Sequence, residues 1–291
     1  MKKIIIIIIL ISSNVFSQKK IYVLDSVTKQ ILPFAEVKLG KKGLYTNEKG
    51  YFIINDTIKK GKIYFLGYKS KSITFKSDTI FLIPKIFELN EIILSQKKES
   101  FVANFLHSDK KYFSSFPLSK NKEILTTIIP KSNKIIGKLE SVSFKLNKII
   151  FDKKKYSKTS KAFIRINIYT NDSNQTKLYA SKPYVVNKDK KDLVTIDLKN
   201  TNIKMPKAGL TFGVEYIGHI DKNGNFIDDS KLVIRPYLVD KNSSLYEQTT
   251  FLRDFFTKKI IIQSFNNYFY SLNKKKVYNR NLSISFVICK S

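Results

Sequence analysis

Hydrophobic and polar residues alternate along much of this 291-residue chain with a period of two, which is the pattern of half-buried β-strands. In the segment FAEVKL at 34–39, Ala35, Val37 and Leu39 fall on one face, while Glu36 and Lys38 fall on the other. Similar runs recur up to residue 94 at intervals of about 8–12 residues, with no helical period between them. This spacing predicts a small β-sandwich over residues 18–96.

The segment GLYTNEKGYFII at 43–54 joins two of these runs and has the composition of a tight turn. Gly43, Asn47 and Gly50 are residue types that tolerate a positive φ. We therefore interpret residues 46–50 as a hairpin turn that specifies the fold, rather than as a binding or catalytic site.

The alternation resumes at Gly137 and continues to the C-terminus. In AFIRINIYT, Ile164 and Ile166 share one face while Arg165 and Asn167 lie opposite. Seven or more such runs predict a jelly-roll-like β-sandwich over residues 138–291. Residues 97–137 are predicted to be a connector, with a candidate short helix in FVANFLHSDKKYF. The fold class is therefore all-β, with two sandwiches in sequence.

The first block resembles the carboxypeptidase regulatory-like domain family in the order and spacing of its landmarks. The matching residues are Asp25, Thr28, Leu32, Pro33, Ala35, Val37, Gly43, Thr46, Asn47, Glu48, Gly50, Phe52, Gly67, Tyr68, Leu89, Glu91 and Ile92. This resemblance implies a transthyretin-like sandwich of seven strands with no catalytic residues, of a kind found in exported and outer-membrane proteins of Bacteroidetes. The second block is similar to a region that follows this domain in some of those proteins, but that similarity implies no activity.

The first 17 residues have the three parts of a secretory signal peptide. Two lysines precede the apolar run Ile4–Ile11, and small or polar residues follow before Gln18. The apolar run is shorter than the roughly 20 residues needed to span a bilayer. We therefore expect an exported protein in the periplasm or at the outer-membrane surface.

The composition is strongly basic, with a formal net charge of +30. Such a balance suits nucleic acid, an anionic surface or acidic polysaccharide. However, the lysines are spread along the whole chain, and export argues against nucleic acid. We interpret most of them as a solvated surface, and we expect a cell-envelope protein or glycan as the partner, through a peripheral association.

Few residues of this chain suit the common catalytic chemistries. The two histidines, His107 and His219, lack the His-x-x-Glu partner of a zinc peptidase, and no G-x-S-x-G elbow accompanies them. The single cysteine, Cys289, permits no internal disulfide and is interpreted as a buried apolar residue. Because glycine-rich phosphate loops are missing too, we expect no catalytic residue and no cofactor.

One stretch, DKNGNFIDD at 221–229, has the character of a cation loop. Its candidate calcium ligands are Asp221, Asn223, Asn225, Asp228 and Asp229. The spacing departs from an EF-hand, and Asn223-Gly224 is a strong hairpin signal. A hairpin turn explains every residue here without a metal and is the preferred interpretation.

Two alternatives to a non-catalytic binding or scaffolding role concern the second block. A glycan hydrolase would need carboxylates facing each other across a cleft, for which Asp197 or Glu215 are candidates, although Glu215 alternates with Phe212 and Tyr216 as an outward-facing residue. A carbohydrate-binding module would need exposed aromatic residues, and several crowd the C-terminal third, although most are expected in the core. These are Phe255, Phe256, Tyr268, Phe269 and Tyr270.

Overall fold

The computed structural model describes residues 18–55, 57–85, 100–103, 113–150, 161–186, 193–229, 232–240, 243–272 and 280–289. The chain divides into two compact units, Met1–Phe87 and Glu88–Ser291, which are described separately. The predicted signal peptide lies outside the described residues. The first unit ends nine residues before the predicted boundary at 96.

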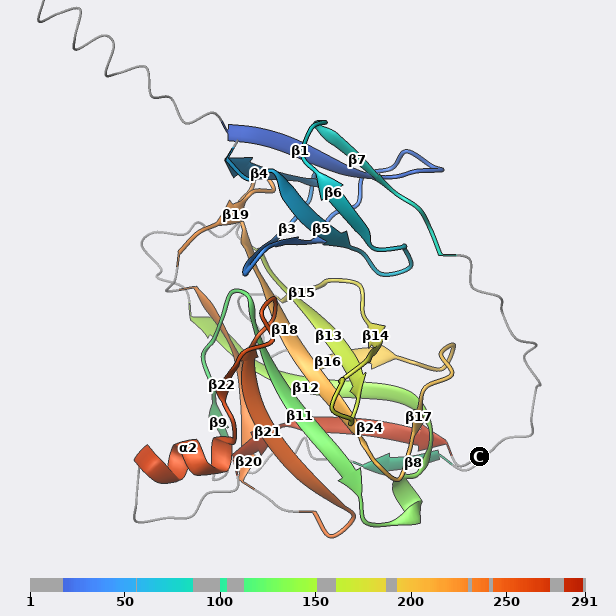
Figure 1. The fold of residues 1–291 in the computed structure, drawn as a ribbon. Coiled ribbons are helices and arrows are strands. Elements are labelled where there is room, and N and C mark those ends of the chain that lie inside the picture. Colours follow the sequence, from blue (N-terminus) through green and yellow to red (C-terminus); the bar gives the residue numbers. More distant parts are fainter. Residues whose placement is uncertain are drawn as a thin grey trace, which may run out of the picture. The chain divides into compact units, whose positions relative to one another are not determined.

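The first unit is a sandwich of two sheets, and its described residues form seven strands (Figure 1). The strands are β1 (Gln18–Asp25), β2 (Glu36–Leu39), β3 (Lys42–Tyr45), β4 (Tyr51–Asn55), β5 (Lys60–Tyr64), β6 (Lys71–Thr74) and β7 (Thr79–Leu82). One sheet has the order β4-β1-β7 and the other β3-β2-β5-β6. The pair β1–β7 is parallel, while the other pairs are antiparallel. The predicted all-β sandwich is confirmed.

The alternation in residues 34–39 correctly identified the core face of β2. Ala35 and Val37 are fully buried, and Leu39 packs against the same cluster. Thr46 fixes the two ends of the loop that enters β2: its hydroxyl donates to the Leu32 carbonyl at 2.7 Å and accepts from the Ala35 amide at 2.8 Å.

The prediction of a hairpin at residues 46–50 was wrong. A turn is present, because the Gly50 amide donates to the Asn47 carbonyl at 2.9 Å and Gly50 has φ +70°. However, β3 and β4 on either side of it belong to different sheets. The segment therefore carries the chain across the sandwich, and the hairpin lies earlier, where β2 pairs with β3 around Gly40.

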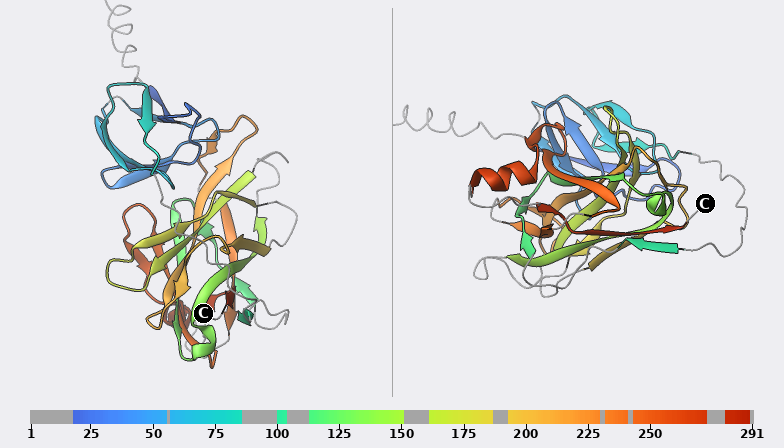
Figure 2. Two further views of the ribbon diagram at one scale, coloured as in Figure 1. Left: turned by 90° about the vertical axis from the view of Figure 1, so that its right-hand side faces the viewer. Right: turned by 90° about the horizontal axis from the view of Figure 1, so that it is seen from below.

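The second unit is also a sandwich of antiparallel sheets (Figures 1 and 2). The first sheet has the order β14 (Lys177–Ala180), β13 (Lys161–Thr170), β18 (Leu210–Ile220), β11 (Lys122–Pro130), β21 (Tyr246–Asp254) and β22 (Ile260–Ile262), with β15 (Tyr184–Val186) on β13 and β19 (Phe226–Ile227) on β18. The second has the order β10 (Leu118–Ser119), β20 (Val233–Asp240), β12 (Gly137–Ile150), β24 (Ile284–Cys289) and β8 (Ser100–Ala103), with β16 (Leu193–Asp197) and β17 (Lys204–Met205) on β12, and β9 (Phe113–Ser115) and β23 (Arg280–Leu282) on β20.

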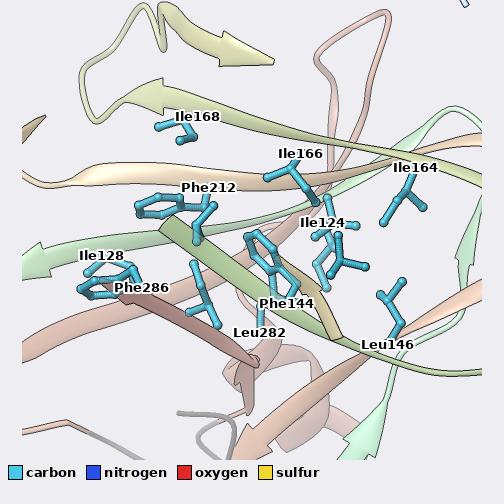
Figure 3. Close-up of a cluster of buried hydrophobic side chains, with 14 of the residues drawn as sticks. Ile124, Ile128, Phe144, Leu146, Ile164, Ile166, Ile168, Phe212, Leu282 and Phe286 are labelled. Carbon is cyan, nitrogen blue, oxygen red and sulfur yellow. The ribbon is translucent and has the colours of Figure 1, made fainter. Parts of the chain in front are cut away.

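The long strands of this unit alternate between the two sheets along the chain. From β11 the chain passes to β12 in the facing sheet, returns to β13, and later alternates through β18, β20, β21 and β24. This is the connectivity of a jelly-roll-like sandwich. One face of each sheet supplies the core: Ile166 and Phe212 from the first sheet meet Phe144 and Phe286 from the second (Figure 3).

The connector predicted over residues 97–137 is instead largely part of this sandwich. Its described residues form β8, β9, β10, β11 and the 3₁₀ turn Asn133–Ile135. β11 pairs with β18 on one side and β21 on the other, so it is a central strand. Its sequence, KEILTTIIP, shows weak alternation because side chains on both of its faces are buried. Most of the candidate helix in 101–113 lies outside the described residues.

Candidate functional site

A row of four charged side chains crosses the first sheet of the second unit, on the face opposite the core. Arg165 on β13 is paired in register with Glu215 on β18, Glu215 with Glu123 on β11, and Glu123 with Arg253 on β21. The order of charges across the four strands is therefore plus, minus, minus, plus. Both glutamates are fully buried, and the arginines are 5% and 3% exposed.

Each carboxylate in this row has an arginine partner. Arg253 approaches Glu123 Oε2 with Nε at 2.9 Å and Nη2 at 2.8 Å, in a side-on arrangement. Arg165 Nη1 lies 3.3 Å from Glu215 Oε1. Buried charges require such partners, because transfer of an isolated ion from water costs several kcal/mol or more.

Neutral groups complete the network between the two glutamates. The amide Nδ2 of Asn167 donates to Glu123 Oε1 and to Glu215 Oε2, both at 2.8 Å. The Tyr169 hydroxyl donates to Glu123 Oε1 at 2.8 Å, and its ring lies 4.7 Å beneath the Arg253 guanidinium. Asn167 and Tyr169 follow Arg165 at intervals of two on β13, so alternation brings all three to the same face.

A glycine leaves the space that the Glu123 side chain occupies. Gly213 on β18 precedes Glu215 by two positions. A Cβ added at Gly213 would lie 2.9 Å from Cδ of Glu123 and would collide with its carboxylate. The backbone of Gly213 needs no positive φ. The absence of a Cβ, and not an unusual backbone conformation, is therefore what the structure requires of Gly213.

The charges around Glu123 keep it ionised. Burial alone would raise the pKa of this carboxyl, but the nearby charges of Arg253, Lys258 and Lys177 and the Tyr169 hydrogen bond outweigh it, so the pKa lies below the usual 4.5. Burial, together with the charge of Glu123, raises the pKa of Tyr169 well above its ordinary value. Tyr169 therefore remains a neutral donor at physiological pH.

This arrangement has the properties of a structural network. A glycoside hydrolase pair needs one carboxyl with a raised pKa, and both groups must reach the substrate. Here both carboxylates are buried, both are bonded to arginine, and the pKa of Glu123 is lowered. These bonds join β13, β18, β11 and β21, so we interpret them as stabilising the sheet.

The structure does not bring the two carboxylates named from the sequence together. Glu215 lies on the face opposite Phe212 and Tyr216, as alternation predicted, but it is buried rather than exposed. Asp197 lies at the end of β16 in the facing sheet, where it is exposed and accepts the Lys199 amide at 2.9 Å. Sequence reasoning missed Glu123 and Arg253, since only strand register shows which charges become neighbours.

Residues 221–225 form the turn between β18 and β19, and residues 226–227 are β19 itself. The carboxylate Oδ1 of Asp221 accepts the backbone amides of Asn223 and Asn225, each at 2.9 Å, and Gly224 has φ +83°. Asp228 is exposed and lies 4.0 Å from the Lys120 ammonium, while Asp229 is half-buried. Across the described residues, no cluster of three or more His, Cys, Asp or Glu side chains has the geometry of a metal site. The calcium interpretation stays a prediction, and the turn itself accounts for the bonds of Asp221.

The histidines and the cysteine have different environments. His219 is buried beside Tyr216, whose hydroxyl is hydrogen-bonded to Nδ1, and burial lowers the His219 pKa to about 4. His107 lies outside the described residues. Cys289, at the end of β24, is partly exposed rather than buried.

The aromatic residues of the C-terminal third lie mostly inside the fold. Phe255 and Phe256 are buried in the turn after β21. Tyr268 and Phe269 belong to a helix that the sequence did not indicate, α2 (Phe265–Leu272), which packs against the core through Phe265. Tyr268 is 37% exposed.

The first unit has a contiguous apolar surface on the outer side of its three-stranded sheet. Tyr51 on β4 lies opposite Tyr22 on β1, and Leu24 lies between Phe81 on β7 and Ile31. Ile53 on β4 extends the row and is 50% exposed, and Phe81 is 38% exposed. We call these residues the apolar face: Tyr22, Leu24, Ile31, Tyr51, Ile53 and Phe81.

Two lysines lie over this surface. The Lys20 ammonium is 3.9 Å from the Tyr51 ring centroid, and the Lys29 ammonium is 4.7 Å from the Phe81 ring centroid. The outward face of a two-layer sandwich is normally polar. Neighbouring apolar side chains that are exposed to solvent form a candidate contact site, and Ile31, Ile53 and Phe81 are the exposed members here.

No helix among the described residues has the length and hydropathy needed to cross a membrane.

Comparison with known proteins gives distant structural likenesses. No family model and no curated protein matches the chain. One similar solved structure comprises the cysteine protease and lectin-like domains of Cwp84, a surface layer associated protein of Clostridium difficile, at 13% identity and a TM-score of 0.33, covering 86% of this chain and 45% of that one. Another is this clostridial cysteine protease after propeptide cleavage, at 14% identity and a TM-score of 0.34, covering 84% and 48%. The chain thus spans less than half the length of these proteins, and at such scores the likeness supports no functional conclusion.

Proposed function

We propose that this protein is a non-catalytic binding or scaffolding component of the cell envelope, which contacts a protein partner through the apolar face of its first unit. The observation that carries the proposal is the apolar face itself. Its six side chains belong to neighbouring positions of β4, β1, β7 and the bridge residue Ile31, on one side of the sheet. The signal peptide that we predict from residues 1–17 supports the proposed location.

Charge identifies the kind of partner. Lys20 and Lys29 lie over the aromatic rings of this face, and the chain as a whole is strongly basic. A second copy of the chain would place the same lysines against each other, which is unfavourable. The partner is therefore a protein surface with an apolar centre and acidic residues around it.

Site-specific photo-crosslinking tests this contact in the full chain. A photoreactive phenylalanine replaces Ile31, and the protein is incubated with the envelope fraction of the cells that produce it. Leu178, which is 46% exposed on β14 of the second unit, is the matched control position. We expect crosslinks to an acidic envelope protein from position 31 and not from 178, and their loss in an Ile53→Ser/Phe81→Ser background. Equal yields from both positions, or yields unaffected by the double substitution, would refute the contact.

Absence of catalysis is tested separately with purified full chain and isolated envelope glycan and peptidoglycan. We expect no release of soluble fragments. Release that is abolished by Glu215→Gln or Asp197→Asn would refute the non-catalytic assignment and support the hydrolase alternative.

A further inference from the structure

The four-stranded sheet of the first unit carries a shallow basic hollow on its outer face. Lys38 on β2 and Lys60 and Lys62 on β5 line it, together with Tyr64, Ser72 and Thr74, and its volume is about 560 Å³. The inward neighbours Val37 and Ile63 are fully buried in the core. The hollow therefore lies on a different sheet from the apolar face, across the sandwich.

Strand register places the three lysines next to one another on the outer face of the sheet. Lys38 is directly opposite Lys62 on the neighbouring strand. Lys60 precedes Lys62 by two positions, so both side chains leave the same face of β5. Like charges directly opposite each other on a sheet destabilise it. Three lysines in this arrangement carry an electrostatic cost that an anion would relieve.

One carboxylate, Glu36, leaves the same outer face of β2 two positions before Lys38, in register with Tyr64, but it is not among the side chains that line the hollow. Lys19 elsewhere in the unit is 3.1 Å from Asp78, and in the second unit Lys122 is 2.9 Å from Asp254. By contrast, Lys38, Lys60 and Lys62 make no ion pair with any described residue. The side chains lining the hollow are basic, hydroxyl-bearing or apolar, and none of them is acidic.

Hydroxyl groups and an aromatic ring complete the lining. Ser72 lies opposite Lys62 and Thr74 opposite Lys60 on β6, and the Tyr64 ring centroid lies 5.0 Å from the Lys62 ammonium. Lysine binds phosphate and sulfate as a mobile point charge, and hydroxyls and an aromatic ring suit the sugar that bears the ester. We infer that the Lys38–Lys60–Lys62 hollow binds a phosphate or sulfate ester group of an acidic glycan.

Direct binding measurements on the full chain test this inference. The probe is a fluorescently labelled sulfated octasaccharide of the heparin type, titrated by anisotropy at low and at physiological ionic strength, with inorganic phosphate as competitor. A neutral glucose octasaccharide and vesicles of phosphatidylglycerol are the comparison ligands. The test variant is Lys38→Gln/Lys60→Gln/Lys62→Gln. The matched control is Lys49→Gln/Lys69→Gln/Lys85→Gln, which removes the same charge from exposed lysines of the same unit outside the hollow.

We expect the hollow variant to bind the sulfated octasaccharide about tenfold or more weakly, because hydrogen bonds to charged groups are the strong ones, whereas the control stays within about twofold. Inorganic phosphate should compete with the octasaccharide, and the neutral octasaccharide should not bind. Equal losses in the two triple variants would show a response to net charge alone and would overturn the inference. Binding to phosphatidylglycerol vesicles without binding to the octasaccharide would overturn it as well. The crosslinking from position 31 is unaffected by either triple variant if the two surfaces are independent.

Discussion

Glu123 and Glu215 lie directly opposite each other on neighbouring strands, and both carboxylates are fully buried. Like charges in this position repel, and burial strengthens the repulsion because the interior screens it poorly. The sheet resolves the conflict by placing an arginine on the outer side of each glutamate and the Asn167 amide between them. The members of the network therefore depend on one another, because removing one of them leaves a buried charge without its partner.

The first prediction concerns Arg253. Replacement by methionine keeps much of the volume but leaves the Glu123 carboxylate buried without its ion-pair partner. We expect Arg253→Met to lower the free energy of unfolding by about 3–5 kcal/mol, the range for breaking a buried ion pair from one side. Urea denaturation followed by circular dichroism at neutral pH measures the change.

The control for Arg253→Met is Lys122→Met, which breaks the neighbouring ion pair with Asp254, where both side chains are partly exposed. Exposed pairs contribute about 0–1 kcal/mol, so this variant should be close to wild type. A similar, small effect for both substitutions would contradict the role given to the buried network.

The second prediction concerns Gly213. An alanine there has an allowed backbone, so its cost should come from the collision of its Cβ with the Glu123 carboxylate. We expect Gly213→Ala to destabilise the protein by about 1–3 kcal/mol, as overpacking does in other interiors. In a Glu123→Ala background the collision is absent, so the same substitution should cost much less. Additive effects of the two substitutions in denaturation experiments would show that the glycine does not act through Glu123.

Strand alternation predicted which side chains share a face of this sheet, but it could not predict which strands pair with each other. It correctly placed Arg165 and Asn167 opposite Ile164 and Ile166, and Glu215 opposite Phe212. It also implied exposure for such residues, because a polar face usually meets solvent. The burial of Glu215 depends on which strands lie on either side, and that pairing joins segments about 90 residues apart.

Strand pairing and burial, which the sequence pattern does not show, also explain the wrong predictions elsewhere in the chain. Residues 46–50 form a turn, as their composition indicated, but composition does not show whether the flanking strands pair. The predicted connector includes β11 because burial of both faces of this strand removes the alternation that identifies strands in a sequence. The sequence pattern does not indicate that Lys38 and Lys62 are opposite each other on neighbouring strands, because lysines occur along the whole chain.

The third prediction concerns pH and His219. Its pKa is about 4 in the folded protein and about 6.5 in the unfolded chain, because burial disfavours the charged ring. The unfolded state therefore binds more protons between these values, and stability falls as pH decreases from 6.5 to 4. The loss approaches about 3 kcal/mol, at about 1.36 kcal/mol for each unit of pKa difference.

A His219→Gln variant tests the assignment, because glutamine does not titrate. It should be less stable than wild type at pH 7, yet its stability should change less between pH 6.5 and 4 in denaturation experiments at fixed salt. Parallel curves for the two proteins in this range would contradict it.

The Glu123 carboxylate affects stability at lower pH. Its pKa is lowered in the folded protein, so its contribution to the free energy of unfolding is complete above pH about 4.5 and is lost as pH falls further.

The fourth prediction concerns Thr46, the residue that closes the loop between the two sheets of the first unit. Its hydroxyl is fully buried, donates to Leu32 and accepts from Ala35, which is 11 positions earlier in the chain. Thr46→Val preserves the shape but leaves a carbonyl and an amide without this partner, so we expect a loss of about 1–3 kcal/mol in the stability of the first unit. The equivalent change at Thr74, an exposed strand residue, should cost less than about 0.5 kcal/mol. Amide hydrogen exchange resolves the effect by residue: the Ala35 amide should exchange faster in Thr46→Val, while amides of the second unit keep their protection. An unchanged exchange rate at Ala35 would show that the hydroxyl does not secure this loop.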